Sequence, residues 1–138
     1  MGNLEDMYQA LVDKLKALVS DGTVVAVLEG FDGIGRDEYP VIYVDMVGST
    51  FEAVTANKDE IRVDVAVEIE TFDEVLEEAK KAIRSLAETV RGKIVEDYSL
   101  GGAVDTVMVE SKDFEMEVYP DGYLCRASLT VSLVRWLF

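Results

Sequence analysis

The 138-residue sequence contains no histidine and only one cysteine, Cys125. Without imidazole, the chain lacks the commonest general base and any serine–histidine or cysteine–histidine nucleophile, so catalysis would have to use carboxylates, lysine, tyrosine or a cofactor. A single cysteine forms no internal disulfide and provides no zinc ligand set. On the apolar side of a strand pattern, Cys125 is expected to be a small buried hydrophobic residue. We therefore predict a protein without catalytic residues, metal or cofactor.

Basic residues are also scarce: 13 stand against 28 acidic ones, which gives a formal net charge of −15. Nucleic-acid affinity depends mainly on lysine and arginine displacing counterions, so sequence-specific nucleic-acid binding is not expected. No stretch approaches the roughly 20 apolar residues that a membrane span needs. The first eight residues include Glu5 and Asp6 but no basic residue, which argues against a secretory signal. These features predict a cytoplasmic protein without a membrane partner.

Hydrophobic residues make up 49 % of the chain, too many for a disordered protein, and the length suits one domain over residues 1–138. Apolar residues at spacings of three and four predict a helix over residues 3–20. A second helix is predicted over 72–91, opened by a capping box of Thr71 and Glu74 and closed by Gly92. The clearest strand is 61–69, where aliphatic and polar residues alternate.

Further strands are expected at 23–28, 41–47, 104–109 and 114–119, and a last one from Tyr123 onward. Residues 29–40 and 48–60 show no clear period and are expected to form a loop and a second long loop or extended arm. The order is α-β-β-β-α-β-β-β. It predicts an α+β fold, with a mostly antiparallel sheet that carries two helices.

The glycine-containing segment 30–38 is the first candidate contact or ligand loop, with Phe31, Asp32, Arg36 and Asp37 as its candidate residues. Its glycines could present backbone N–H groups to an anion, but its acids would repel phosphate and it lacks the ending of a P-loop. Its carboxylates could hold a hard cation, although their spacing does not match an EF-hand. A plain connection, a subunit contact and a ligand or metal site therefore all remain open.

Bulky apolar residues mark a candidate subunit interface. Val134, Trp136 and Phe138 fall on one side of an extended segment and Leu137 on the other. Chain ends fray unless something ties them down, so this end is expected to be buried in the domain's own sheet or in a neighbouring subunit. Phe51, alone in the segment 48–60, is either a lid over the core or an interface anchor.

This element order resembles that of the tail-terminator (tail-completion, or minor tail) proteins of long-tailed bacteriophages and proviruses. The resemblance rests on the leading helix with Leu11, Leu15 and Leu18, on "PVIYVDMVGS", on "RVDVAVEIET" running into "FDEVLEEAKKAIRSLAETV", and on "YLCRASLTVSLV". It implies a non-enzymatic homo-oligomer, a hexameric ring that caps the tail tube and meets head-connector proteins. Such a protein is cytoplasmic during assembly and then part of the virion. An acidic ring would let DNA pass without sticking.

Two other functions compete with this one. The chain could be a small-ligand-binding or regulatory α+β domain that uses residues 30–38 as the edge of its pocket. A metal-dependent enzyme built on paired carboxylates is the third possibility, although with 28 acids some pairs are expected by chance.

Overall fold

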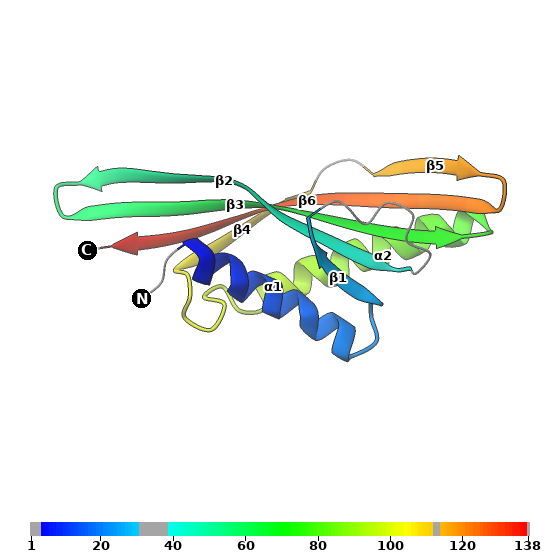
Figure 1. Ribbon diagram of the computed structural model, residues 1–138, viewed down its shortest axis with the longest axis horizontal. Coiled ribbons are helices and arrows are strands. Elements are labelled where there is room, and N and C mark those ends of the chain that lie inside the picture. The colour runs from blue at the N-terminus through cyan, green and yellow to red at the C-terminus, as the bar shows by residue number, and fades with distance from the viewer. Residues whose placement is uncertain (1–3, 31–38, 112–113, 138) are drawn as a thin grey trace.

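A computed structural model describes residues 4–30, 39–111 and 114–137, which form a six-stranded sheet with two helices on one face (Figure 1). The predicted α+β class and the predicted order of elements are both confirmed. In chain order the elements are α1 (Leu4–Ser20), β1 (Ala26–Glu29), β2 (Val41–Thr55), β3 (Lys58–Asp73), α2 (Leu76–Val95), β4 (Thr106–Ser111), β5 (Glu115–Tyr119) and β6 (Gly122–Leu137).

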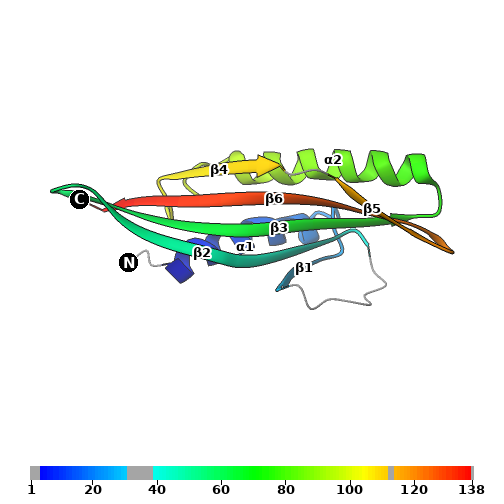
Figure 2. The ribbon, with the colours of Figure 1, turned by 90° about the horizontal axis from the view of Figure 1, so that it is seen from above.

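The strands lie in the order β1-β2-β3-β6-β4, and β5 also pairs with β6. Only β1 and β2 run parallel; all other pairs are antiparallel. β4 pairs with residues 129–134 of β6 and β5 with residues 122–126, so these two short strands follow one another along the same edge of β6. The long strands β2, β3 and β6 form the centre of the sheet, as Figure 2 shows.

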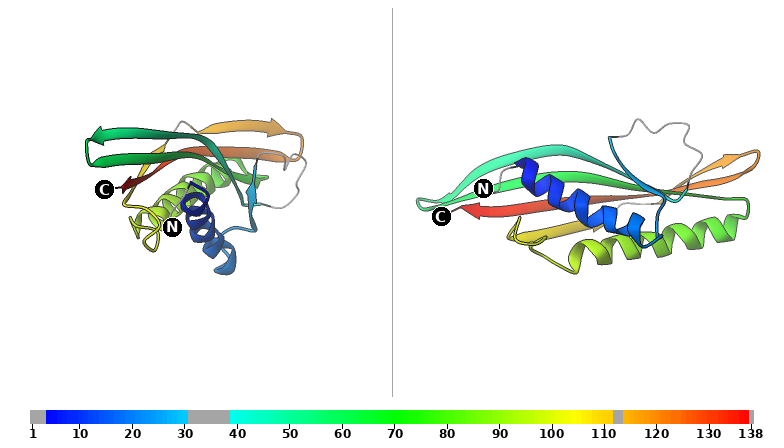
Figure 3. Two further views of the ribbon diagram at one scale, coloured as in Figure 1. Left: turned by 60° about the vertical axis from the view of Figure 1, so that its left-hand side comes forward. Right: turned by 60° about the horizontal axis from the view of Figure 1, so that its bottom comes forward.

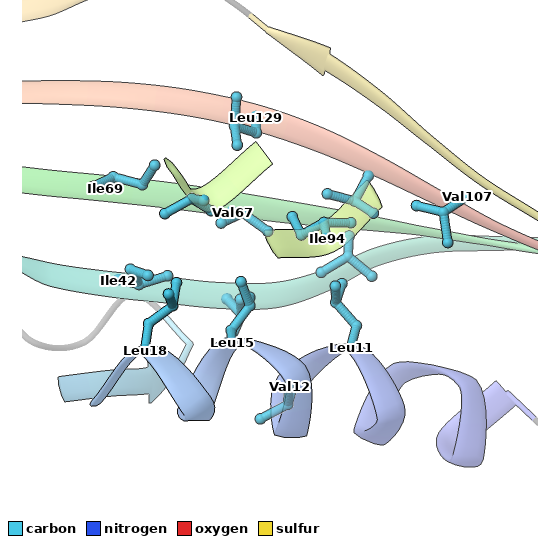
Figure 4. Close-up of a cluster of buried hydrophobic side chains, with 14 of the residues drawn as sticks. Leu11, Val12, Leu15, Leu18, Ile42, Val67, Ile69, Ile94, Val107 and Leu129 are labelled. Carbon is cyan, nitrogen blue, oxygen red and sulfur yellow. The ribbon is translucent and has the colours of Figure 1, made fainter. Parts of the chain in front are cut away.

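The core lies between the sheet and the two helices. Leu11, Leu15 and Leu18 recur at helical spacing on α1, are buried, and point at the sheet (Figure 4). On β3 the aliphatic residues of the predicted alternation, from Ile61 to Ile69, are all buried on this helix side. Figure 3 shows both helices on that same side, which leaves the opposite face of the sheet, here called the open face, without a helix in the described ranges.

The start of the second helix was predicted wrongly. β3 continues to Asp73, and Thr71 is buried in that strand opposite Cys125, so Thr71 and Glu74 do not form a capping box. Asp73 makes the turn instead: its Oδ1 accepts the Val75 N–H at 2.8 Å, and α2 begins one residue later. The capping pattern involves only neighbouring residues, whereas β3 pairs with the distant strand β6 as far as Asp73. This long-range pairing determines where the strand ends and the helix begins.

The end of this helix was also predicted too early. Gly92 lies inside α2, which continues to Val95. Ile94, two residues further on, is fully buried in the core. Burial of an isoleucine side chain is worth about 2 kcal/mol. That exceeds the roughly 1 kcal/mol that glycine costs a helix, so packing carries the helix past Gly92.

The short strands begin later in the chain than predicted. β1 starts at Ala26 rather than at 23, because the N–H groups of Thr23 and Val24 both donate to the Leu18 carbonyl and close the end of α1. Gly22 supports this ending with a φ of +84°, a conformation common after helices. β4 and β5 are likewise found at Thr106–Ser111 and Glu115–Tyr119.

Residues 48–60 were expected to form a second long loop or an extended arm, and the loop alternative is wrong. They form a β-hairpin: β2 runs to Thr55, β3 starts at Lys58, and Ala56 and Asn57 make a two-residue connection. The prediction failed because most side chains here are exposed on both faces, so the alternation of apolar and polar residues that reveals a half-buried strand is missing. The connection also lacks the Asn-Gly or Asp-Gly pair that marks tight hairpins.

Tyr8 on α1 gives the fold a testable alkaline limit. Burial, together with the nearby Glu29 carboxylate and a hydrogen bond to it, raises the pKa of Tyr8 to about 12. In the unfolded chain this phenol ionises near pH 10. Between pH 10 and about 12 the unfolded state therefore loses the proton while the folded state keeps it, and the free energy of unfolding falls over this range. Urea unfolding between pH 9 and 12 should show a smaller loss for Tyr8→Phe than for the parent chain. Equal slopes would contradict this assignment.

Candidate assembly interface

The hairpin formed by residues 48–61 extends beyond the helices at one end of the molecule and is here called the arm (Figure 1). It begins at a β-bulge, where the β2–β3 register shifts between Met46 and Gly48 and leaves Val47 exposed. A bulge bends a strand and increases its twist. The end of β6 completes the arm as a third strand, because Leu137 pairs with Asp59.

The helix side of the arm carries apolar side chains without a cover. Phe51 pairs across the sheet with Ile61, and Leu137 lies one strand further on, so both point to the same side as the core. Yet Phe51 is 68 % exposed and Leu137 is 41 % exposed, because α1 does not reach this far. Asp59 shares this side and is exposed. Of the two readings of Phe51, an exposed anchor fits this position and a lid over the core does not.

The end of β6 pairs within the domain's own sheet, the first of the two alternatives, but Leu137 is exposed there and not buried as expected. Val134 is buried, Trp136 is half-buried, and Phe138 falls outside the described residues. The Trp136 indole N–H donates to Glu60 Oε1 at 3.1 Å, and Lys58 Nζ lies 4.3 Å from the ring centroid. These contacts hold the indole on the open face, so Leu137 remains the free apolar residue of this strand end.

Asp105, which directly precedes β4, holds the end of β6 in place through two hydrogen bonds. Its Oδ2 accepts the Trp136 backbone N–H at 2.6 Å, and its own N–H donates to the Val134 carbonyl at 2.8 Å. Asp105→Ala removes the charge-assisted bond and should lower the free energy of unfolding by about 1–2 kcal/mol. Urea unfolding followed by Trp136 fluorescence measures this loss. Asp121→Ala, in the exposed β5–β6 turn, is the control and should change little; an equal loss in both would contradict the anchor.

The outer edge of β2 is the second unpartnered feature of this end. β1 pairs only with residues 41–44, and in the described ranges no strand pairs with that edge of β2 from Asp45 onward. Residues 45–55 contain no proline, lysine or arginine, but Asp45, Glu52 and the bulge after Met46 give this edge other kinds of protection. The backbone groups of this edge have no strand partner in the described ranges.

The open face of the sheet is strongly acidic. Pairing places the following acids on it: Asp45, Glu52, Glu60, Asp64, Glu68, Glu70, Glu110, Glu115 and Glu117. Arg126 lies among them, with Nη2 3.4 Å from Glu70, Nη1 3.5 Å from Glu115 and Nε 4.0 Å from Glu68. Burial works to lower the pKa of Arg126, but Glu70 and Glu68 outweigh it and raise that pKa. The guanidinium thus holds three carboxylates together across three strands.

A second polar group on this face links β3 to β6. The buried Ser132 hydroxyl donates to Asp64 Oδ1 at 2.7 Å and accepts from Arg62 Nη2 at 3.0 Å, while Arg62 Nε lies 3.2 Å from the same carboxylate. Each of the three side chains therefore has a hydrogen-bond partner in both of the others. Because Asp64 and Ser132 are directly opposite each other on β3 and β6, these hydrogen bonds favour the observed register of the two strands.

A groove between α2 and β5 was not anticipated from the sequence. It measures about 300 Å³ and is lined by Lys80, Ile83, Arg84, Phe114, Glu115, Met116 and Cys125. Cys125 forms part of its floor and is buried, as predicted, and burial raises the pKa of its thiol despite the nearby Lys80. One feature of the sequence could have indicated the groove: Phe114, Met116 and Val118 alternate with acids. The structure shows that the apolar side of this strand is exposed.

The other candidate site lies outside the described residues. Phe31, Asp32, Arg36 and Asp37 all fall in the segment 31–38, so the proposed ligand or metal loop stays a prediction. Within the ranges that the structure describes, no group of three or more aspartate, glutamate or cysteine side chains is arranged to hold a metal ion. In those same ranges, neither helix has the length and apolar character needed to cross a membrane.

Comparison with known proteins assigns no family. No protein-family model matches the chain, and no curated protein matches its sequence.

Proposed function

We propose that this protein is a structural assembly subunit that associates with copies of itself through the arm, in the manner of a tail terminator. The observation that carries this proposal is Phe51, an aromatic side chain 68 % exposed on a strand that projects beyond its own core. Burying one phenylalanine side chain at a contact is worth about 2–3 kcal/mol. The adjacent Leu137 and the unpartnered edge of β2 add to the same surface.

The acidic open face supports a ring through which DNA moves. A surface that carries many carboxylates repels phosphates and excludes tight binding by counterion release. The ion pairs of Arg126 keep this face ordered without making it attractive to anions. In a ring whose channel is lined by this face, DNA would pass without sticking. The ring would cap a tail tube and present its other surface to head-connector proteins, assembling in the cytoplasm and ending in the virion.

Electron microscopy of the purified protein tests the proposal. At micromolar concentration, negatively stained particles should be rings of uniform diameter with a central channel. Phe51→Asp should yield single subunits under the same conditions, which ties the rings to the arm. A field of single subunits for the parent protein at every concentration would contradict the proposal.

A further inference from the structure

The groove between α2 and β5 lies toward the end of the molecule opposite the arm (Figure 1). Phe114 and Met116 on its wall are 52 % and 44 % exposed, and Ile83 and Cys125 form its buried floor. Its volume of about 300 Å³ is at the lower end of the range for ligand pockets, enough to admit an aromatic side chain. An apolar surface of this kind favours an apolar occupant.

The rim of the groove is basic in a chain that is otherwise acidic. Lys80 and Arg84 line it, and in the described part of the chain neither forms an ion pair. The one acid among its lining residues, Glu115, is already paired with Arg126. Two cations that form no ion pair in that part of the chain, beside an apolar surface, favour an occupant that combines an aromatic residue with a carboxylate.

The arm of a second copy has this chemistry. Phe51, Asp59 and Leu137 lie together on its helix side, with both apolar side chains exposed. The cation on that side, Arg135, is occupied by the Ala103 carbonyl at 3.0 Å. Contact between arm and groove brings the Asp59 carboxylate toward the cations Lys80 and Arg84, which are opposite in charge.

We propose that the arm of one copy docks in the α2–β5 groove of the next, with Phe51 against Phe114 and Met116 and with Asp59 facing Lys80 and Arg84. This inference rests on the proposed self-assembly and names the surface that receives the arm. Because arm and groove are different surfaces at opposite ends, the contact is heterologous: each copy donates one arm and receives another. A heterologous contact closes into a ring when the rotation between copies allows it.

A complementation experiment tests this head-to-tail contact. Phe51→Asp disables the arm and Met116→Asp disables the groove; both positions are exposed, so both variants should fold, and circular dichroism checks this. Light scattering should find each variant alone at the monomer mass of 15.3 kDa. Their equimolar mixture has one intact arm–groove pair and should reach twice that mass and no more. A mixture that stays at the monomer mass would overturn the head-to-tail contact.

Reversal of charge gives an independent readout. Asp59→Lys should weaken assembly at least tenfold, as should Lys80→Glu with Arg84→Glu, and combining all three changes in one chain should restore it. If Met116→Asp and Lys80→Glu with Arg84→Glu assemble as the parent does while Phe51→Asp does not, the groove proposal fails and arm-mediated assembly stands. If the parent chain never assembles, the proposed function itself fails, so the two failures are distinguishable.

Discussion

Phe51→Asp should convert the assembled protein to monomers. Phe51 is the most exposed aromatic residue of the arm. Removing an aromatic anchor from the centre of an interface typically weakens the free energy of binding by about 2 kcal/mol or more. A carboxylate at this position adds the cost of removing a charge from water against an apolar surface. We expect each subunit contact to weaken at least about 30-fold. Sedimentation velocity at several concentrations measures the change.

Tyr98→Asp is the matched control for that substitution. Tyr98 is 62 % exposed in the connection after α2 and belongs neither to the arm nor to the groove. The exchange introduces the same charge in place of a similar aromatic ring, so it should leave the assembled state unchanged. If both substitutions dissociate the assembly equally, the added negative charge and not the loss of Phe51 would be the cause of dissociation. If neither does, the arm is not an interface.

Arg126→Met should produce the largest loss of stability among the surface substitutions. It leaves Glu70, which is nearly buried, beside Glu68 and Glu115 with no opposite charge. Removing the cation lowers the free energy of unfolding by more than the ion pairs themselves contribute to it. The reason is that the remaining carboxylates are partly desolvated and repel one another. We expect the free energy of unfolding to fall by about 2–4 kcal/mol. Urea unfolding at pH 7 measures this loss.

Two further variants sharpen this prediction. Arg91→Met removes a cation from the exposed side of α2 and should cost less than about 0.5 kcal/mol. Adding Glu70→Gln to Arg126→Met should recover part of the loss, because it removes the most buried unpaired charge. A loss for Arg126→Met no larger than that for Arg91→Met would show that the cluster is too well solvated to matter.

Much of the fold could be predicted from periodicity alone. The stripe of Leu11, Leu15 and Leu18 and the alternation in β3 and β6 are consequences of facing one shared core, and each is visible in a short window of sequence. The errors arose where distant contacts decide the structure. Thr71 and Glu74 have the spacing of a capping box, but pairing of β3 with β6 keeps Thr71 in a strand.

The candidate interface was predictable only in part. Phe51 and the end of β6 could be recognised from the sequence, because bulky apolar residues in irregular or terminal segments are usually buried against the core or in an interface. The hairpin that presents Phe51 could not be found, since strands exposed on both faces carry no burial pattern. The groove could not be found either, because its basic rim comes from α2 and its apolar wall from residues 114–116, more than 25 positions away.

The arm also explains why the molecule is expected to act through its surfaces. Its strands extend past the helices, so Phe51 and Leu137 are exposed, whereas the aliphatic residues from Ile61 to Ile69 on the same side of β3 are buried. Contiguous exposed apolar surface is typical of interaction sites. The partner that we propose is a second copy, because the opposite end offers an apolar groove with Lys80 and Arg84 on its rim.

The most direct test is the mass of the unmodified protein in solution, measured by light scattering across a hundredfold range of concentration. The proposal of assembly through the arm predicts a single species at a whole-number multiple of 15.3 kDa, which dissociates only on dilution. A mass of 15.3 kDa at the highest concentration would contradict it.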